Sequence, residues 1–274
     1  MRIARIIRTL LLISSCCIVS YAHGQTVIKS TDTVKKAKPY TAPRPLAKGP
    51  KPIKHEFSGG FRLNSDGWGI FTEFGKVKTK DVRHSDMFHN VRIWQIEFAE
   101  KKNPKEEKLD AENASGSGTN KYVYGKINDF YTLKFGYGFR KMLVGKPDPG
   151  TVSIHWVNAG GLALGLLKPY YINVYSDPSA IKYSDATKAD FLNQSLIEGS
   201  AGFSKGLSET KFVPGAYFKS ALHFDFSTNR KNVIGVETGI NIEYYSQEVQ
   251  LLANQPAVPY FLDLYIGVQV GRRW

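Results

Sequence analysis

The chain has 274 residues, of which 42% are hydrophobic and 13% aromatic, and its formal net charge is +13. Its 15 Tyr, 16 Phe and 25 Gly occur without an apolar run of the ~20 residues that a transmembrane helix needs, which excludes an ordinary helical membrane protein. An aromatic- and glycine-rich chain of this kind favours many β-strands over helices.

The N-terminal segment has the layout of a secretory signal peptide. Three arginines precede a short apolar run, residues 10–19, and small residues follow it. Cleavage after Ala22 or Gly24 would remove residues 1–24 and export the rest of the chain. The apolar run is too short to span a bilayer, so a signal anchor is disfavoured.

A lipid anchor is the alternative interpretation of this segment. Ile13-Ser14-Ser15-Cys16 resembles a lipobox, in which Cys16 would be lipidated, although Cys17 and the residues after it continue the apolar stretch. Both cysteines lie within the signal, so cleavage leaves a mature protein without a thiol. Its stability would then come from a source other than disulfides, such as a closed, hydrogen-bonded barrel.

Residues 25–55 form a Lys/Pro-rich segment with Asp32 as its only acid. Such a composition cannot bury a core, and we expect a disordered periplasmic segment. It could tether the chain to an acidic partner, to lipid head groups or to the cell wall. No nucleic-acid partner is predicted, because the chain is exported and carries no recognised nucleic-acid module.

From Glu56 onward the apolar residues alternate with polar or small ones, which is the signal of β-strands. Asp66-Gly67 favours a tight hairpin between the first two strands. Residues 56–274 are therefore expected to be all-β, an antiparallel up-and-down transmembrane β-barrel of eight strands. The strands are predicted at 57–63, 68–78, 94–98, 131–139, 152–166, 218–226, 234–244 and 262–270. Ten strands are possible if residues 168–175 form a strand of their own.

One face of nearly every predicted strand is large and apolar, and the other is glycine, small residues and charges. In a membrane barrel the apolar face contacts lipid and the polar face fills the lumen. In a soluble sandwich or periplasmic ligand-binding barrel the apolar face would point inward, and many surface glycines would weaken the strands. The membrane barrel is favoured. Only the second strand is ambiguous, because Ile70 and Phe71 compete for the apolar face.

Aromatic residues near the predicted strand ends suit the girdles of a membrane barrel. Trp68, Trp156, Tyr170 and Tyr171 are expected to occupy these interfaces. Trp274 follows directly after the last alternating strand, and it resembles the assembly signal of outer-membrane barrels.

Loop lengths predict the orientation. With both ends of the barrel in the periplasm, long loops face outside. The predicted outer loops are 101–121, 176–210, with a short helix at 190–197, and 247–259, together with the tight turn 64–67. The predicted periplasmic turns are 80–90, 141–150 and 228–231.

Five short segments within residues 57–273 carry a resemblance to a known family. They are Phe57-Ser58-Gly59-Gly60-Phe61-Arg62, Asp66-Gly67-Trp68-Gly69, Glu100-Lys101-Lys102-Asn103-Pro104-Lys105-Glu106-Glu107-Lys108, Gly165-Leu166-Leu167-Lys168-Pro169-Tyr170-Tyr171 and Lys211-Phe212-Val213-Pro214-Gly215. On these segments, residues 57–273 resemble an uncharacterised family of small outer-membrane β-barrel proteins from Bacteroidota-type bacteria. The architecture also resembles the OmpA and OmpX barrels, by analogy only. The resemblance implies fold and compartment, and no activity.

The polar faces predict a set of charged residues in the lumen. An eight-stranded barrel is just wide enough for its own side chains to fill, and unpaired buried charge is costly. We therefore expect a paired charge network, with a narrow channel or small-ligand transport site as the alternative. The predicted members are Arg62, Glu73, Glu97, Lys134, Lys219, His223, Asp225, Glu237, Glu243 and Asp263.

No catalytic, cofactor or metal site is predicted. Ser153 and His155 lie two residues apart on one strand face, as a lipid A-modifying hydrolase would require, but no third residue is evident to orient the histidine. His84, His89 and Asp86 could form a weak metal site in a turn, although exposed loop histidines are usually only polar.

The sequence predicts an outer-membrane protein of a Gram-negative bacterium with a structural or surface-interaction role, and no enzyme. Its expected partners are outer-membrane lipid, the barrel-assembly machinery and a surface ligand bound through loops 101–121 and 176–210, because loops on a rigid scaffold often carry function. A monomer is the expected state.

Overall fold

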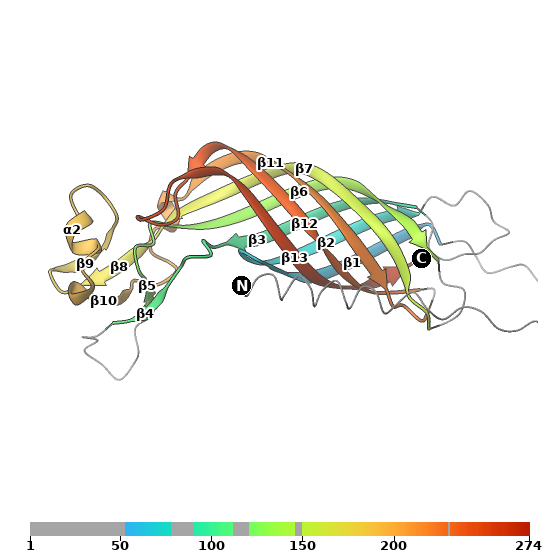
Figure 1. Ribbon diagram of the computed structural model, residues 1–274, viewed down its shortest axis with the longest axis horizontal. Coiled ribbons are helices and arrows are strands. Elements are labelled where there is room, and N and C mark those ends of the chain that lie inside the picture. The colour runs from blue at the N-terminus through green and yellow to red at the C-terminus, as the bar shows by residue number, and fades with distance from the viewer. Residues whose placement is uncertain (1–52, 78–89, 112–120, 146–149, 230) are drawn as a thin grey trace, which may run out of the picture. The chain divides into compact units, whose positions relative to one another are not determined.

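Eight long antiparallel strands close into a barrel in the order β1-β13-β12-β11-β7-β6-β3-β2 (Figure 1). The computed structural model describes residues 53–77, 90–111, 121–145, 150–229 and 231–274. Strands that follow one another in this order are also consecutive along the chain, so the predicted up-and-down topology is confirmed. The barrel strands are β1 (His55–Asn64), β2 (Gly67–Val77), β3 (Val91–Lys101), β6 (Asn128–Val144), β7 (Ser153–Pro169), β11 (Lys211–Asp225), β12 (Asn232–Val249) and β13 (Val258–Arg273).

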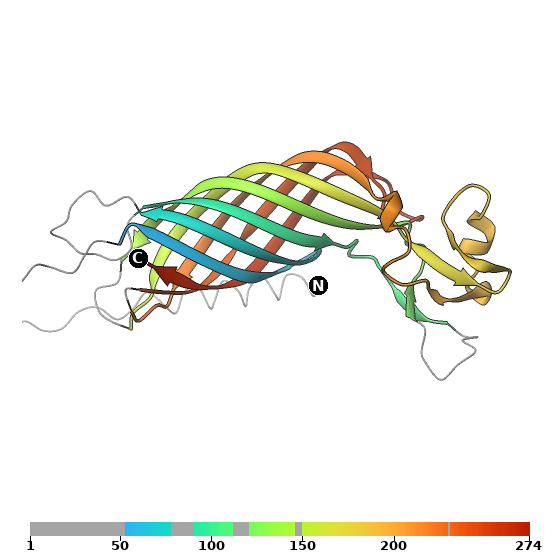
Figure 2. The same ribbon diagram turned by 180° about the vertical axis from the view of Figure 1, so that it is seen from behind.

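The barrel closes between its first and last strands, which run side by side in Figure 2. Glu56 pairs with Arg273, and the antiparallel register continues to Asn64 and Tyr265. The Trp274 amide donates to the carbonyl of His55, and the His55 amide donates to the carbonyl of Trp274. These bonds leave no free edge between β1 and β13, as a closed barrel requires.

The alternation of the strands sorts their side chains by polarity, with the apolar ones outward. Leu162 is 72% exposed and Leu262 66% exposed on the outer wall, whereas Arg62 and Lys134 on the inner face are buried. A soluble barrel has the opposite arrangement, because it buries its apolar face. The ambiguous second strand is settled by Phe71, which is buried on the inner face, while Ile70 is exposed on the outer wall.

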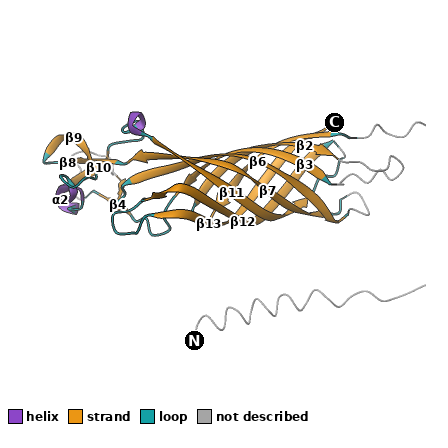
Figure 3. Cartoon of the chain, turned by 90° about the horizontal axis from the view of Figure 1, so that it is seen from above, coloured by secondary structure: helices purple, strands orange, loops and turns teal. Residues whose placement is uncertain are grey.

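Five short strands lie outside the barrel and form, with short helices, what we call the extension. They make a three-stranded sheet in the order β10-β8-β9 and a β4-β5 hairpin. In Figure 3 they gather beyond the end of the barrel opposite the C-terminus. The elements are β4 (Lys108–Asp110), β5 (Lys121–Val123), β8 (Tyr171–Val174), β9 (Asp177–Lys182), β10 (Ile197–Ser200), α2 (Lys188–Phe191) and the 3-10 helices η1 (Gln194–Leu196) and η2 (Leu207–Glu209).

The extension corrects three sequence-based expectations. A strand does form within residues 168–175, but β8 pairs with β9 and β10 and not with a barrel strand, so the ten-stranded barrel is wrong. The helix expected at 190–197 is two separate pieces, α2 and η1. Tyr170 is also no girdle residue, because it is buried within the extension core, and Tyr171 begins β8.

The strand ends extend further than the alternation alone indicates. Of the predicted loop 101–121, only Lys101 belongs to the barrel, because β3 ends there. The predicted loop 247–259 is shorter in the structure, because β12 continues to Val249 and β13 begins at Val258. The signal peptide, almost all of the segment 25–55, most of the turn 80–90 and the centre of the turn 141–150 lie outside the described residues. Across the part of the chain that is described, no helix is long and apolar enough to cross a membrane.

Candidate functional site

The barrel interior brings together all ten charged residues that the sequence assigns to the lumen. Each is buried, at no more than 3% exposed, on the inner face of its strand. They come from seven of the eight barrel strands, and they meet because the inward positions of all strands point at a common axis. Their ion pairs divide the interior into three clusters along the barrel.

The first cluster lies at the end of the barrel where β1 begins and β13 ends. Arg140 Nη1 lies 2.7 Å from Glu56 Oε1, and its other terminal nitrogen contacts Glu73. Arg273 Nε lies 2.6 Å from the second Glu56 oxygen, and its Nη2 lies 2.5 Å from Asp225 Oδ2. Two guanidinium groups thus join three carboxylates into one chain, a use of the fork geometry that lysine cannot supply.

The second cluster fills the middle of the barrel. Arg62 contacts Glu97 and places Nη2 2.9 Å from Glu237 Oε1. Lys219 Nζ lies 3.0 Å from the same Glu237 oxygen, and Lys134 Nζ lies 2.6 Å from Glu97 Oε1. Every one of these charges has an opposite charge as a partner, which offsets much of the cost of removing it from water.

Two aromatic rings complete the surroundings of Arg62. Its guanidinium carbon lies 3.9 Å from the centre of the Phe71 ring and 4.9 Å from that of Tyr265. A desolvated cation over an aromatic face gains further stabilisation. This contact also explains why Phe71, and not Ile70, takes the inward position.

The third cluster lies toward the extension. Lys101 contacts Asp263, and its Nζ lies 3.0 Å from Asp66 Oδ2 and 3.2 Å from Glu243 Oε1. The Tyr245 hydroxyl donates to the other Glu243 oxygen at 2.6 Å. One ammonium thus serves three carboxyl groups. Burial raises the pKa of Asp66 to about 6, although Lys101 opposes this shift.

The side chains leave little open space in the middle of the barrel. The gap between Arg62, Glu97, Lys219 and their neighbours has no room for a water molecule. The third and second clusters are joined by Lys134, whose Nζ is also 2.9 Å from Glu243 Oε1. This arrangement can hold the barrel together, and it resembles a plug more than an ion path.

Five members of this interior network are absent from the set predicted from the sequence, and one of them is Asp66 in the β1–β2 turn. Glu56 and Arg273 lie at the ends of their strands, beyond the predicted limits, and Lys101 falls within the predicted outer loop. Arg140 lies on the polar side of the clearest alternating segment and could have been included from that signal alone. Strand ends are the least reliable part of a sequence-based assignment.

The Ser–His pair considered for the hydrolase alternative does not form a nucleophilic site in this geometry. Ser153 and His155 are both buried on the inner face of β7, and Ser153 Oγ has no hydrogen-bond partner among the described residues. His155 instead faces His223 on β11, with 6.0 Å between the ring centres. A buried serine without a base offers no support for the hydrolase alternative.

A metal site also lacks support in the described part of the chain. No group of three His, Cys, Asp or Glu residues there could hold an ion. The candidate ligands His84, Asp86 and His89 fall within residues 78–89, which lie outside the described residues.

The extension joins the two loops that were expected to carry a surface ligand. Its core consists of residues from both: Tyr122 comes from the first loop region, and Ile172, Phe191 and Ile197 come from the second. The Tyr170 hydroxyl accepts a hydrogen bond from the Val123 amide at 3.2 Å. A separate hydrophobic core means that the described parts of these loops form a folded unit.

The extension surface carries one network of exposed polar groups. Glu209 contacts Lys182 and accepts a hydrogen bond from the Tyr171 hydroxyl at 2.7 Å. The hydrogen bond from Lys182 lowers the pKa of the Glu209 carboxyl, with Tyr171 adding to the effect. These contacts tie η2 to β8 and β9, so they orient the segment that returns to the barrel.

Comparison with solved structures finds other small barrels. The β-barrel domain of Pseudomonas aeruginosa OprF is 11% identical with a TM-score of 0.34, and the match covers 82% of this chain and all (100%) of that domain. The attachment invasion locus protein Ail of Yersinia pestis, solved with the heparin analogue sucrose octasulfate, is 8% identical with a TM-score of 0.35, covering 82% and 100%. Neisserial surface protein A is 9% identical with a TM-score of 0.35, covering 81% and 97%. Likenesses this low carry no argument about function.

Searches with protein-family profiles and among curated proteins each found no match to this chain. The eight-stranded architecture expected from the OmpA and OmpX resemblance is confirmed by the closed barrel itself. The Bacteroidota-type family and origin stay predictions.

Proposed function

We propose that this chain is an outer-membrane β-barrel that anchors the extension at the cell surface, with a structural or surface-interaction role. The observation that carries this proposal is the apolar outer wall around a charged, ion-paired interior. Exposed apolar patches larger than a few hundred Å² are rare on soluble monomers. A lipid bilayer is the environment in which a barrel with an apolar outer surface on all sides is stable.

The orientation follows from the connections. The long connections β3–β6 and β7–β11 leave one end of the barrel and contain every strand of the extension. The β1 start and the β13 end lie at the other end. By the loop-length rule of outer-membrane barrels, the extension faces outside and the β1 and β13 ends face the periplasm.

The interior supports an anchoring role better than a transport role. Its charges are paired across the lumen, and the gap between Arg62, Glu97 and Lys219 has no room for a water molecule. The extension, in contrast, is a folded unit on a rigid scaffold, where binding functions are often found. The narrow channel therefore takes second place, and a soluble ligand-binding barrel conflicts with the outward direction of the apolar side chains.

Protease treatment of intact cells tests the proposal. The β8–β9 turn around Tyr175 is exposed, so an added protease is expected to cut there in whole cells. A membrane-protected fragment from β11 onward should remain, and periplasmic marker proteins should stay intact in the same sample. Cutting that requires broken cells would contradict the surface location of the extension.

Three further expectations belong to this proposal and concern the processing of the chain. Sequencing the mature N-terminus distinguishes cleavage after Ala22 or Gly24 from lipidation at Cys16. Replacing Trp274 by alanine tests the proposed assembly signal, with less folded barrel in the outer membrane as the expected result. The barrel-assembly machinery is the partner that this signal implies.

A further inference from the structure

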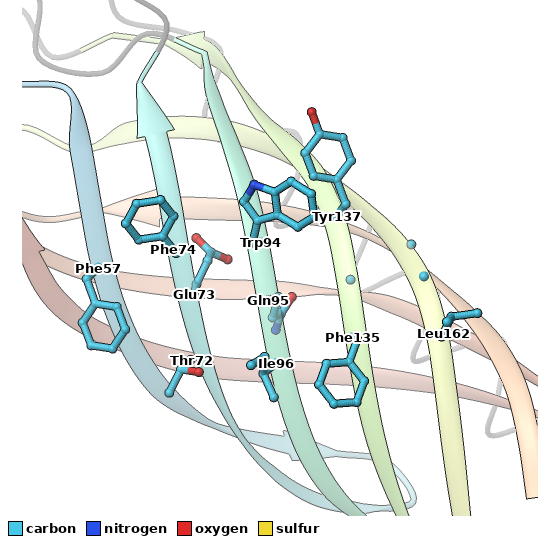
Figure 4. Close-up of a pocket in the computed structure, with 13 residues that line it drawn as sticks. Phe57, Thr72, Glu73, Phe74, Trp94, Gln95, Ile96, Phe135, Tyr137 and Leu162 are labelled. Atoms are coloured by element: carbon cyan, nitrogen blue, oxygen red, sulfur yellow. The ribbon is translucent and has the colours of Figure 1, made fainter.

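One part of the outer wall is hollowed. An apolar groove of about 470 Å³ crosses β1, β2, β3, β6 and β7, with Phe57, Phe74, Trp94 and Tyr137 among its walls (Figure 4). Gly160 leaves an outward position without a side chain, opposite Tyr137 in the β6–β7 register. The volume falls in the range of small-ligand sites, about 300–1,000 Å³.

A pair of like charges lies at one end of this groove. Lys76 and Arg92 are directly opposed in the β2–β3 register, two positions beyond Phe74 and Trp94 on the same outward face. Both side chains are exposed, and neither has an ion-pair partner among the described residues. Like charges directly opposite each other on a sheet destabilise it. A shared anion would relieve that repulsion.

A histidine lies beside this basic pair. His55 pairs with Lys76 in the β1–β2 register, and its ring lies 5.8 Å from that of Phe74. Its Nδ1 is buried. Lys76 and Arg92 are therefore the exposed groups of this basic row.

We propose that the groove binds one anionic phospholipid, with an acyl chain against Phe74, Trp94 and Tyr137 and the phosphate between Lys76 and Arg92. This inference rests on the proposed function, which places the wall in a membrane and the basic row at its periplasmic face. Phosphatidylglycerol has the required chemistry, since it combines a diester anion with two acyl chains. A second copy of the chain fits less well, because a two-fold interface would bring two identical basic pairs together.

Quenching of tryptophan fluorescence by brominated lipids tests the site on the full chain. The protein is placed in phosphatidylcholine vesicles that contain dibrominated phosphatidylglycerol or, in a parallel sample, dibrominated phosphatidylcholine. The variant Trp94→Phe assigns the part of the signal that comes from the groove. Two basic side chains near a membrane surface predict a preference for the anionic lipid at Trp94 of about fivefold to thirtyfold.

Variants that remove positive charge test whether Lys76 and Arg92 cause the preference for the anionic lipid. The double variant Lys76→Gln/Arg92→Gln is expected to reduce it to about onefold to twofold, close to no preference. Lys231→Gln is the control, because that exposed lysine precedes β12, across the barrel from β2 and β3, and it is expected to keep the full preference. A mobility shift on heating verifies that each variant forms the barrel.

The outcomes separate this inference from the proposed function. Equal quenching of Trp94 by both lipids in the unmodified protein would overturn the lipid site and leave the membrane barrel standing. Quenching of other tryptophans but not of Trp94 would also overturn it, and would indicate that a second copy covers the groove. No quenching of any tryptophan by either lipid would contradict the membrane barrel itself.

Discussion

Arg62 on β1 and Glu237 on β12 form an ion pair across the barrel interior, with 2.9 Å between Nη2 and Oε1. β13 lies between these two strands in the barrel order, so the pair connects strands that share no backbone hydrogen bonds. Arg62 also contacts Glu97 on β3, on the other side of β2. The Arg62 guanidinium therefore links its own strand, β1, to β3 and β12.

Replacing Arg62 by methionine should destabilise the barrel strongly. The change leaves Glu97 and Glu237 with one cation fewer, and breaking a buried pair by removing one partner costs about 3–5 kcal/mol. Urea unfolding of the detergent-solubilised protein measures the loss. Lys231→Met removes an exposed charge in the same assay and should change the unfolding free energy by less than about 0.5 kcal/mol. Equal effects of the two changes would contradict the role of Arg62.

The turn between β1 and β2 should give the barrel a pH-dependent stability. Burial raises the pKa of Asp66 from 3.8 to about 6. A carboxyl group with a raised folded pKa holds its proton more tightly when folded, so its stabilising contribution is full below about pH 4 and is lost as the pH rises through about 6. The pKa difference corresponds to about 3 kcal/mol.

Asp66→Asn should remove this part of the pH dependence. Compared with the unmodified protein, the variant should gain stability as the pH rises from 4 to 7, because it has no carboxyl group to ionise beside Asp263 and Glu243. Urea unfolding at several pH values measures the difference. Asp185→Asn, at an exposed position in the extension, should follow the unmodified protein. A constant difference between D66N and the unmodified protein across this range would exclude the proposed titration.

The extension should unfold without the barrel. Phe191 is buried at 1% exposed in the extension core, and replacing it by alanine removes contacts worth about 3–5 kcal/mol. Faster hydrogen exchange and protease cutting within residues 170–200 are expected, with an unchanged heat-induced mobility shift of the barrel. Leu207→Ala, at a half-exposed position, is the control and should change neither. Loss of the mobility shift in the Phe191 variant would show that the two parts fold together.

The ion-paired interior predicts a barrel that does not conduct. Purified protein in a planar bilayer should give no stepwise current, because the gap around Arg62 and Lys219 holds no water. Replacing Arg62 and Tyr265 together by serine removes two large groups that line this gap and is expected to produce small, frequent conductance steps. Steady steps from the unmodified protein would instead favour the narrow channel.

The alternation of the chain was sufficient to predict the barrel and its polar interior. Residues such as Lys134 and Glu243 take the inner face because period-two alternation fixes the facing of their strands, although it left the facing of β2 ambiguous. Their partners could not be predicted, because pairing depends on the stagger of strands that are not neighbours. The Arg62–Glu237 pair, whose members are 175 positions apart in the sequence, is the clearest case.

The extension could not be predicted from the sequence, for a different reason. Its strands are as short as three or four residues, as in β5 and β8, so none shows the repeated alternation that identifies a strand. Tyr170 was therefore assigned to a membrane girdle by its position after a long strand. The core that buries it forms only when two loops from distant parts of the sequence meet.

Gel mobility of the membrane-extracted protein, unboiled against boiled, tests the central claim most directly. A closed barrel in lipid resists detergent until heated, so the protein from an outer-membrane fraction should migrate at different positions in the two samples. We expect this difference in mobility, and we expect the protein to be recovered in the outer-membrane fraction. A protein recovered from the soluble periplasm with identical mobility in both samples would contradict the membrane barrel.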